Sequence, residues 1–381
     1  MVHHQDMQPH EFHYFQNKEI DELYLSIALR TFAQSLIAIF VPIYLLNLGF
    51  SVPSIIIFYL VYYIVATAAM PHAMAFNSFG IKKNMAFGTV TSILFYLFLT
   101  QISSVHYSLV AIMGGLSAAA YFAGYHIEFS HFHTKGSEGK QSSIIQSSTI
   151  LAASLGPILG GFLIEGFTYT MVFVIASVLL LLSLVPLFFT KDYRMKTQEI
   201  NVTKILKSDD MTKGWAYIAS GSTLVIAGIF WPLFIFEQLG SVSSLGAIIS
   251  ITSILLAVFS FYLGKKVDGS FRKVFRIGIS LYSLSWILRL LLLNPIGLFI
   301  SNTYAAFTGT LIELPMAKMI YSRSKNLMNY FLYREFYLFL GRVTILVIAL
   351  FVQEYVFLFV LAFLCTQLYW FLAKSQKKKS S

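Results

Sequence analysis

The sequence predicts an all-α integral membrane protein of about twelve transmembrane helices, with both termini in the cytoplasm. Hydrophobic residues make up 57% of the 381 residues and charged residues only 12%, whereas soluble domains carry about a quarter charged residues. The apolar residues lie in continuous runs, without the period-two alternation of barrel strands. Among the connections between these runs, basic residues occur only in every second one.

The apolar runs define the expected spans one by one. A helix needs about 20 mostly apolar residues to cross the hydrocarbon core of a bilayer. The expected spans cover residues 23–47, 52–74, 84–103, 107–127, 144–165, 168–190, 214–237, 242–263, 273–293, 297–318, 329–352 and 354–373. Trp231–Pro232 predicts a kink in the seventh span, because proline removes a helical hydrogen bond.

The connections between the spans alternate in character. Those near residues 47–51, 103–106, 166–167, 239–241, 294–295 and 353–354 are short and hold no lysine or arginine, whereas the others are basic. Since basic residues mark the cytoplasmic side, the basic connections and both termini are expected in the cytoplasm. The expected domains are a tail (1–21), a six-helix bundle (22–190), a central loop (191–213), a second six-helix bundle (214–373) and a basic tail (374–381).

Composition excludes several classes of function. The formal net charge of +10 is explained by orientation in the membrane, so no nucleic-acid partner is expected. The single Cys365 excludes an intrachain disulfide and a cysteine metal cluster. The polar start of the chain predicts no cleavable signal peptide, and its histidines predict no metal site. No nucleotide-binding loop occurs, so a proton or ion gradient is the expected energy source, and no cofactor is expected.

Two basic connections, one in each half, share a local pattern of glycine, an acidic or amide residue, and basic residues. The first copy consists of Asn77, Gly80, Lys82 and Lys83, and the second copy of Gly264, Asp268 and Arg272. With six expected spans on each side of the central loop, the chain resembles the major facilitator superfamily from about residue 23 to residue 373. The resemblance implies two bundles that rock about a midplane site.

In that family these connections act as latches that close the cytoplasmic side. An acidic residue caps a neighbouring helix end there, and the bases pair with partner helices. Asn77 stands at the acidic position of the first copy. It can accept the same hydrogen bond but supplies no charge, so the resemblance implies a weaker first latch. A role in topology alone remains the alternative for both copies.

Residues 156–161 read GPILGG, in the fifth expected span. Pro157 loosens the helix, and Gly156, Gly160 and Gly161 let another backbone approach. The core of this stretch is similar to a motif of proton-coupled drug antiporters in the family, which implies efflux. Close helix packing explains the same residues equally well. The stretch YHIEFSHFHTKG at 125–136 resembles the end of span four in prokaryotic members.

Ionisable residues inside spans are costly, so each is a candidate functional residue. Arg30 lies in the first span, and its four-residue spacing from Ser26 and Gln34 predicts one shared helix face. Glu313 lies in the tenth span at a similar expected depth. It could carry a proton, bind a cationic solute or pair with Arg30, and the sequence leaves these open.

Four further ionisable residues are candidates. His126 and Glu128 end the fourth span and could take part in proton coupling. Glu335 and Arg342 lie two turns apart in the eleventh span, which predicts a shared face at the cytoplasmic gate. Arg289, near the outer end of the ninth span, is expected to extend to the outer surface.

The sequence therefore predicts a multi-pass secondary transporter in the plasma membrane, with no catalytic residues and no bound metal. The expected partners are the lipid bilayer and a small-molecule solute, and we expect a monomer. Proton-coupled efflux of amphipathic compounds is the first hypothesis, and uptake or exchange of an organic anion or sugar is the second. A receptor or lipid scramblase, and a lipid-modifying enzyme that uses the span-four histidines, are alternatives of another class.

Overall fold

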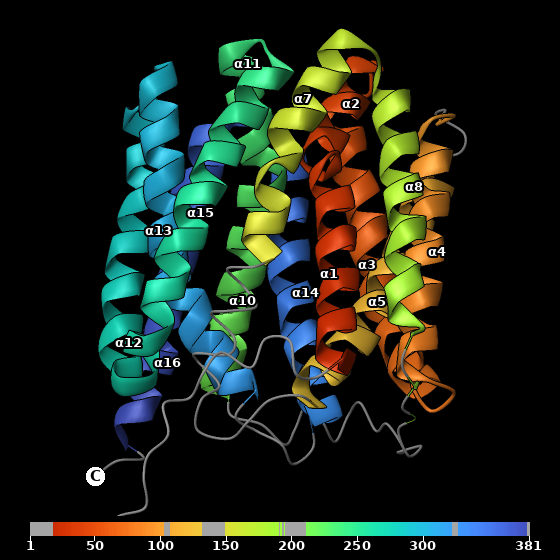
Figure 1. The fold of residues 1–381 in the computed structure, drawn as a ribbon. Coiled ribbons are helices and arrows are strands. Elements are labelled where there is room, and N and C mark those ends of the chain that lie inside the picture. Colours follow the sequence, from red (N-terminus) through yellow and green to blue (C-terminus); the bar gives the residue numbers. More distant parts are fainter. Residues whose placement is uncertain are drawn as a thin grey trace, which may run out of the picture.

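The computed structural model describes residues 18–102, 107–131, 149–189, 191–192, 194, 211–321 and 327–378, and the regular structure in these ranges is entirely helical (Figure 1). The amino-terminal half contains α1 (Lys18–Ser35), η1 (Ala38–Phe40), α2 (Val41–Asn47), α3 (Val52–Phe76), α4 (Ile81–Leu99), α5 (Tyr107–His131), α7 (Gly156–Gly166) and α8 (Tyr169–Leu187). The carboxyl-terminal half contains α10 (Met211–Val225), η2 (Ile226–Phe230), α11 (Trp231–Leu239), α12 (Val242–Leu291), α13 (Pro295–Tyr321), α14 (Leu327–Phe351), α15 (Tyr355–Gln367) and α16 (Tyr369–Lys378).

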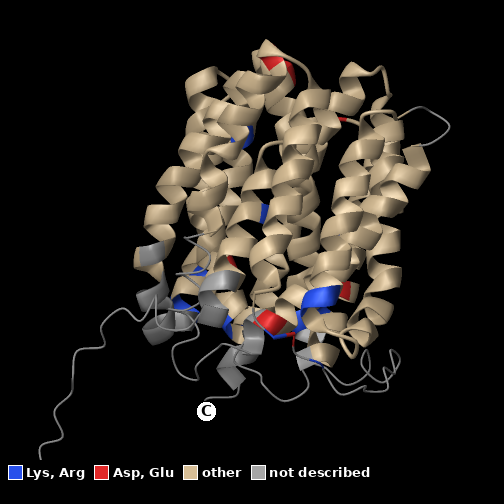
Figure 2. Cartoon of the chain, turned by 45° about the vertical axis from the view of Figure 1, so that its right-hand side comes forward, with Lys and Arg blue, Asp and Glu red and all other residues tan. Residues whose placement is uncertain are grey.

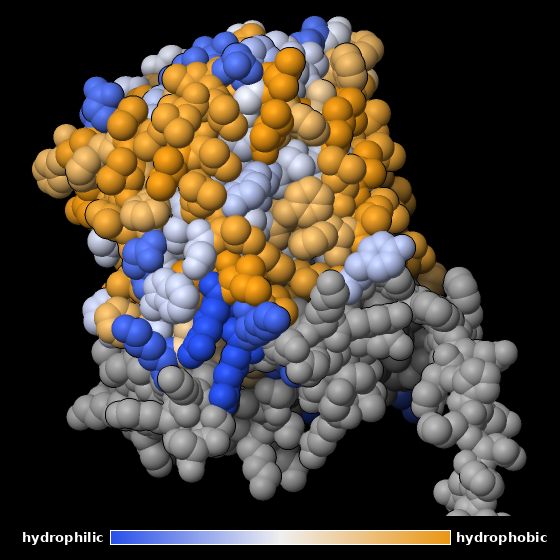
Figure 3. Space-filling model, turned by 90° about the vertical axis from the view of Figure 1, so that its left-hand side faces the viewer, coloured by the Kyte–Doolittle hydropathy of each residue, from blue (hydrophilic) through white to orange (hydrophobic). Residues whose placement is uncertain are grey.

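The surface of the bundle matches a membrane setting. Within the described ranges, nine segments are long and apolar enough to cross a membrane, and α4, α13 and α14 run alongside them. Large apolar side chains such as Leu181 and Val258 are more than half exposed. Among the described residues, most lysines and arginines lie at the end of the bundle that holds the carboxyl terminus (Figure 2). On the face in Figure 3, apolar side chains form a broad belt, with hydrophilic side chains near both ends. The count of twelve spans and the cytoplasmic side of the basic end remain predictions.

Three helix breaks inside the expected spans lie next to a proline, whereas Pro71, Pro186 and Pro315 lie inside unbroken helices. The first expected span is divided into α1, η1 and α2, with Pro42 in the first turn of α2. The seventh contains η2, a π-helical turn directly before Trp231–Pro232, where a kink was expected. The fifth breaks at Leu155, and α7 then starts with Gly156–Pro157. Proline lacks the N–H that would continue the helical ladder, so the chain changes its helical geometry at these points.

The connection expected at 264–273 is helical, which corrects the prediction of a loop there. α12 keeps helical backbone over 50 residues, Val242–Leu291. A straight helix of that length would measure about 75 Å. However, the guanidinium of Arg289 lies 4.3 Å from the ring centroid of Trp231, which precedes α12. The chain therefore folds back within α12. Because the backbone stays helical through this turn, fewer N–H and C=O groups lose their hydrogen-bond partners than if one helix ended and another began.

The two halves meet closely along α7 and α12. A Cβ built on Gly161 of α7 would lie 2.8 Å from Cα of Ser243, and one built on Gly246 of α12 would lie 2.2 Å from the Pro157 carbonyl oxygen. The Ile158 N–H, next to the helix break, donates to Oγ of Ser250 at 2.9 Å. Glycine at these positions is what allows backbone to touch backbone.

The glycines of α7 also face the amino-terminal half. A Cβ on Gly160 would lie 1.9 Å from the Leu36 carbonyl oxygen, and one on Gly156 would lie 1.8 Å from Oγ of Ser35. At the end of α7, Glu165 accepts hydrogen bonds of 2.9 Å from the Ser243 N–H and the Ser241 hydroxyl. Glu165 thus caps the first turn of α12, where a negative charge is favourable.

The halves are in contact at both ends of the bundle. One buried cluster joins Ile37 and Val41 to Leu233 and Val242, near the end where α7 meets α12. A second cluster joins Met74 and others of the amino-terminal half to carboxyl-terminal residues at the basic end. A cavity between the halves is therefore bounded by packed side chains above and below.

Candidate functional site

A cavity of about 460 Å³ lies between the two halves. Its walls come from α1, α3, α4 and α5 on one side and from α10 and α14 on the other. The lining residues are Gln34, Ala38, Val41, Phe58, Tyr59, Tyr62, Tyr63, Ala66, Thr67, Met70, Phe95, Tyr96, Ala118, Ala119, Phe122, His126, Leu224, Arg334, Glu335 and Arg342. This central cavity is large enough for a small organic molecule.

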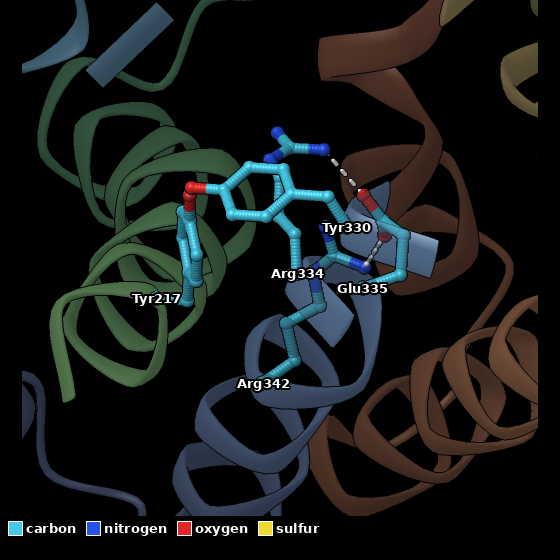
Figure 4. A network of polar contacts seen from close by, with 5 residues as sticks. All are labelled: Tyr217, Tyr330, Arg334, Glu335 and Arg342. Atoms are coloured by element: carbon cyan, nitrogen blue, oxygen red, sulfur yellow. Dashed lines mark hydrogen bonds and ion pairs between the residues drawn. The ribbon is translucent and has the colours of Figure 1, made fainter. Parts of the chain in front are cut away.

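The ion pairs of the central cavity are formed by residues of α14. Glu335 lies 2.5 Å from Nη1 of Arg334 and 3.5 Å from Nη1 of Arg342, so one carboxylate is shared by two guanidinium groups (Figure 4). Glu335 and Arg342 are seven residues apart, about two helical turns, which places them on the same face. The Nε of Arg342 is buried and has no hydrogen-bond partner. Arg342 thus keeps one unsatisfied N–H beside the cavity that it lines.

Tyrosines form the facing wall on α3. Tyr59, Tyr62 and Tyr63 follow a three- and four-residue spacing that points them to one side of the helix. The Tyr63 ring lies 5.0 Å below the guanidinium of Arg342, which is a cation–π contact between the two halves. Phe95 and Phe122 extend the same wall. The cavity thus joins a charged strip to a broad aromatic surface.

His126 lines the central cavity at the contact between α5 and α14. Its ring stacks on Phe331 with centroids 4.4 Å apart and an interplanar angle of 15°. Both side chains are buried, and they belong to different halves. His126 therefore forms part of the closure at the basic end. Glu128, two residues further on, is 1% exposed and does not line the cavity.

Arg30 lies inside the amino-terminal half rather than in the central cavity. It is 3% exposed and donates to the hydroxyls of Thr89 at 2.9 Å and Ser92 at 3.1 Å, both on α4. The Tyr121 ring of α5 covers its guanidinium at 3.6 Å. Of the polar stripe expected on α1, Gln34 alone lines the cavity, since Ser26 bonds to α8.

Glu313 lines a second cavity, of about 280 Å³, within the carboxyl-terminal half. Residues of α10, η2, α12, α13 and α16 form its walls. The hydrogen bonds of Arg30 go to α4, so the structure does not bring Arg30 and Glu313 together. The two residues that the sequence placed at similar depth thus belong to different halves and different surroundings.

The comparisons with known proteins agree with this architecture. The model of the Major Facilitator Superfamily matches residues 23–218, just over half of the chain. The chain belongs to this superfamily. The crystal structure of the human organic anion transporter MFSD10 (TETRAN) matches with a TM-score of 0.67 and 12% identity, over 94% of this chain and 100% of that one. No curated protein sequence matches.

Family and fold together support a multi-pass membrane protein that acts as a secondary transporter of a small solute. Members of the superfamily are generally transporters. The two copies of the motif that was predicted to act as a latch lie between α3 and α4 and within α12.

In the first copy of the motif, Asn77 is fully buried at the end of α3. Its amide donates to the Ala123 carbonyl of α5 at 3.2 Å and accepts from the Asn84 amide of α4 at 2.8 Å. Asn84 also donates to the Ala73 carbonyl at 2.8 Å. A pair of amides thus ties three helices together without any charge. This amide pair could not be found from Asn77 alone, because Asn84 lies a loop and a helical turn away.

The charge at the start of α4 comes from the central loop. Asp192 accepts from the N–H groups of Lys82 at 2.8 Å and Lys83 at 3.4 Å. Gly80 precedes them with φ +148°, and a Cβ there would lie 2.0 Å from the Asp192 carboxylate. An acidic residue at a helix N-terminus satisfies orphaned donors and the helix dipole. Sequence reasoning missed Asp192, since it lies far along the chain from the motif.

The second latch is described only in part. Arg272 is exposed near the middle of α12. The backbone of Gly264 and Asp268 is helical, but their side chains lie outside the described residues, as do His133 and most of the central loop. The gate role of this motif remains a prediction.

Arg289 does not reach the outer surface, contrary to expectation. It is 4% exposed, and the rings of Trp231 and Trp286 lie 4.3 Å from its guanidinium. Stacking on two indoles explains how a cation is kept inside the half. Among the cavity residues, sequence reasoning missed Arg334 as a site residue and the tyrosines of α3. Their signal was present, since tyrosines in the middle of a span lie away from the membrane interfaces where they usually gather.

Proposed function

We propose that the protein transports a small amphipathic organic anion through the central cavity, by alternating access across the plasma membrane. The observation that carries the proposal is the charge on α14. Two arginines and one glutamate line the cavity, which leaves an excess of positive charge. A solute with one carboxylate or sulfonate would complement this excess.

Arg342 is the residue proposed to hold the anionic group. Its Nε is without a partner, and its distance of 3.5 Å to Glu335 is longer than that of a good charged hydrogen bond. Glu335 keeps its shorter contact with Arg334 at 2.5 Å. A solute anion can therefore displace Glu335 from Arg342 while Glu335 stays paired. Arginine is suited to this exchange because its planar fork binds carboxylates bidentately.

The aromatic wall is proposed to hold the rest of the solute. Tyr59, Tyr62 and Phe122 offer ring faces and a few hydroxyl groups. Such a surface binds an apolar or aromatic body and leaves polar substituents with partners. The amphipathic solute expected from the sequence is compatible with it, whereas a sugar, which needs many hydrogen bonds, suits it less. The name of MFSD10 also describes an organic anion transporter.

The GPILGG motif at residues 156–161 favours proton-driven export. The contacts of Gly160 and Gly161 with Leu36 and Ser243 give these glycines a packing role, so the motif requires no antiport. The central cavity alone supports the transport proposal. The direction of transport and the coupling ion are to be measured in the flux assay.

The test is flux in proteoliposomes that contain the purified protein. Three solutes with one ring system are compared: an aromatic carboxylate, its neutral amide and the matching amine. We expect flux of the carboxylate alone, with Arg342→Gln raising its half-saturating concentration by about tenfold, since a charged hydrogen bond contributes about 1.5–3 kcal/mol. Arg194→Gln, an exposed site in the central loop, is the matched control. Preference for the amine, or an unchanged Arg342→Gln, would contradict the proposal.

The same vesicles test the other classes of function. A scramblase would move labelled lipid between leaflets without any solute flux, and a lipid-modifying enzyme would produce a new lipid. Neither result is expected, because the polar groups of α14 open into a cavity between the halves.

A further inference from the structure

Arg289 carries hydrogen-bond donors for which the protein supplies no acceptor. Its side chain is 4% exposed, and its Nε and Nη1 are buried without a hydrogen-bond partner. The Nε1 of Trp286, one turn earlier on α12, is buried and without a partner as well. The Arg289 guanidinium lies 4.3 Å from the centroid of the Trp286 ring, so these donors belong to one contact. About 90% of buried polar groups have a partner, so this cluster requires an explanation.

The surroundings of Arg289 offer rings rather than acceptors. Its second ring neighbour, Trp231, uses its own Nε1 to donate to Oδ1 of Asn302 at 2.9 Å, so that amide oxygen already has a donor. Both indoles also pack against Phe359, which is buried. The ion pairs of the described residues lie on α14, and none of them includes Arg289. The rings attract the cation, but they do not balance its charge.

One edge of the Arg289 guanidinium is open to a small particle. Its Nη2 makes no hydrogen bond, yet it is not among the buried nitrogens without a partner, so a water-sized sphere reaches it. The N–H groups of Nε and Nη2 are parallel in the fixed fork of a guanidinium, and this edge can bind an anion with both. The edge is therefore suited to a small anion, whereas the ring surroundings disfavour a multiply charged ion such as sulfate.

We propose that Arg289 and Trp286 bind a chloride ion inside the carboxyl-terminal half. Chloride is monatomic and accepts hydrogen bonds from several directions, so one ion can accept from both side chains. It also balances one positive charge, which removes the cost of burying an uncompensated guanidinium. Neither Arg289 nor Trp286 lines the central cavity. The chloride is thus a resident ligand that stabilises this half, and it is distinct from the transported solute.

The test measures chloride binding without any transported solute, so its outcome is independent of the organic-anion proposal. Thermal unfolding of the purified protein is followed in mixtures of sodium chloride and sodium gluconate at constant ionic strength and pH. We expect chloride to raise the melting temperature in a saturable manner, and bromide to do the same, because its charge is equal and its size is similar. Arg289→Met keeps a long side chain without the charge and should abolish this response.

Trp286→Phe keeps a ring beside Arg289 and removes one N–H, so the half-saturating chloride concentration should rise by about tenfold. This variant keeps the proposal testable if Arg289→Met does not fold. Trp231→Phe is the matched control, because its Nε1 already donates to Asn302, and its chloride response should be unchanged. Arg342→Gln should also keep the response, since Arg342 belongs to the central cavity.

Three results would overturn the chloride site. Gluconate could stabilise the protein as well as chloride does. Folded Arg289→Met or Trp286→Phe could keep the wild-type half-saturating concentration. Arg342→Gln could abolish the response, which would place the chloride in the central cavity instead.

Discussion

The contact between α7 and α12 predicts that Gly161→Ala changes the conformation of the transporter rather than only its stability. Gly161 is the glycine of α7 that faces the other half. A Cβ at this position would lie 2.8 Å from Cα of Ser243 and 2.9 Å from the Val242 carbonyl oxygen. Carbon atoms pack at about 3.5–4.0 Å, so the helices would have to separate by about 1 Å.

The magnitude follows from the cost of overpacking. Forcing a methyl group into a closed contact costs about 1–3 kcal/mol. The two halves avoid this cost when they part at the end where Glu165 caps α12. A bias of that size changes the ratio of two conformations by about five- to 150-fold. Gly161→Ala should therefore populate a state that is open at this end.

Distances between introduced labels measure that change. The single Cys365 is replaced by serine, and cysteines are placed at Phe167 and Gln238, which are exposed and belong to different halves. We expect a longer label distance in Gly161→Ala than in the parent protein. Gly160→Ala is the matched control, since its Cβ would meet Leu36 in the same half, and it should lower the melting temperature without lengthening the distance. An unchanged distance in Gly161→Ala would refute the reasoning.

Three further predictions concern the amino-terminal half. Asn77→Asp, which restores the acid of the superfamily motif, should lower the melting temperature, because a carboxylate cannot donate to the Ala123 carbonyl; a stabilised variant would contradict this. Asp192→Ala should cost about 1 kcal/mol in denaturant unfolding through loss of the α4 cap, and an unchanged midpoint would show that the cap contributes nothing. Arg30→Lys should lower stability by about 1–3 kcal/mol yet leave the half-saturating solute concentration unchanged; a weakened solute response would return Arg30 to the binding site.

The helical fold and two of the helix breaks could be predicted because their causes are local. Apolar runs and prolines act within one or two turns of their own position, so α11 and α7 begin next to Pro232 and Pro157, where the sequence indicated a change in the helix. The neighbours of Arg30 could not be predicted in the same way. Thr89 and Ser92 lie 59 and 62 residues away along the chain, and no local pattern relates them.

The polar stripe of α1 shows a second limit. Ser26, Arg30 and Gln34 are spaced four apart, and each step turns the side chain by about 40° relative to the last. Over two steps the direction changes by about 80°. That rotation is enough to carry the stripe from α8, where Ser26 bonds, to the central cavity, where Gln34 lies. A shared face holds for neighbours four apart and fails over eight residues.

The joint between α7 and α12 is made of main-chain atoms at Gly161 and Gly246, and this separates two tasks within the molecule. A contact built from backbone keeps its shape whatever rotamers the surrounding side chains adopt. The proposed solute contacts, in contrast, are made by side chains of α3 and α14. Exchanging residues of the cavity wall should therefore change which compound is bound while the contact between the two halves is left intact.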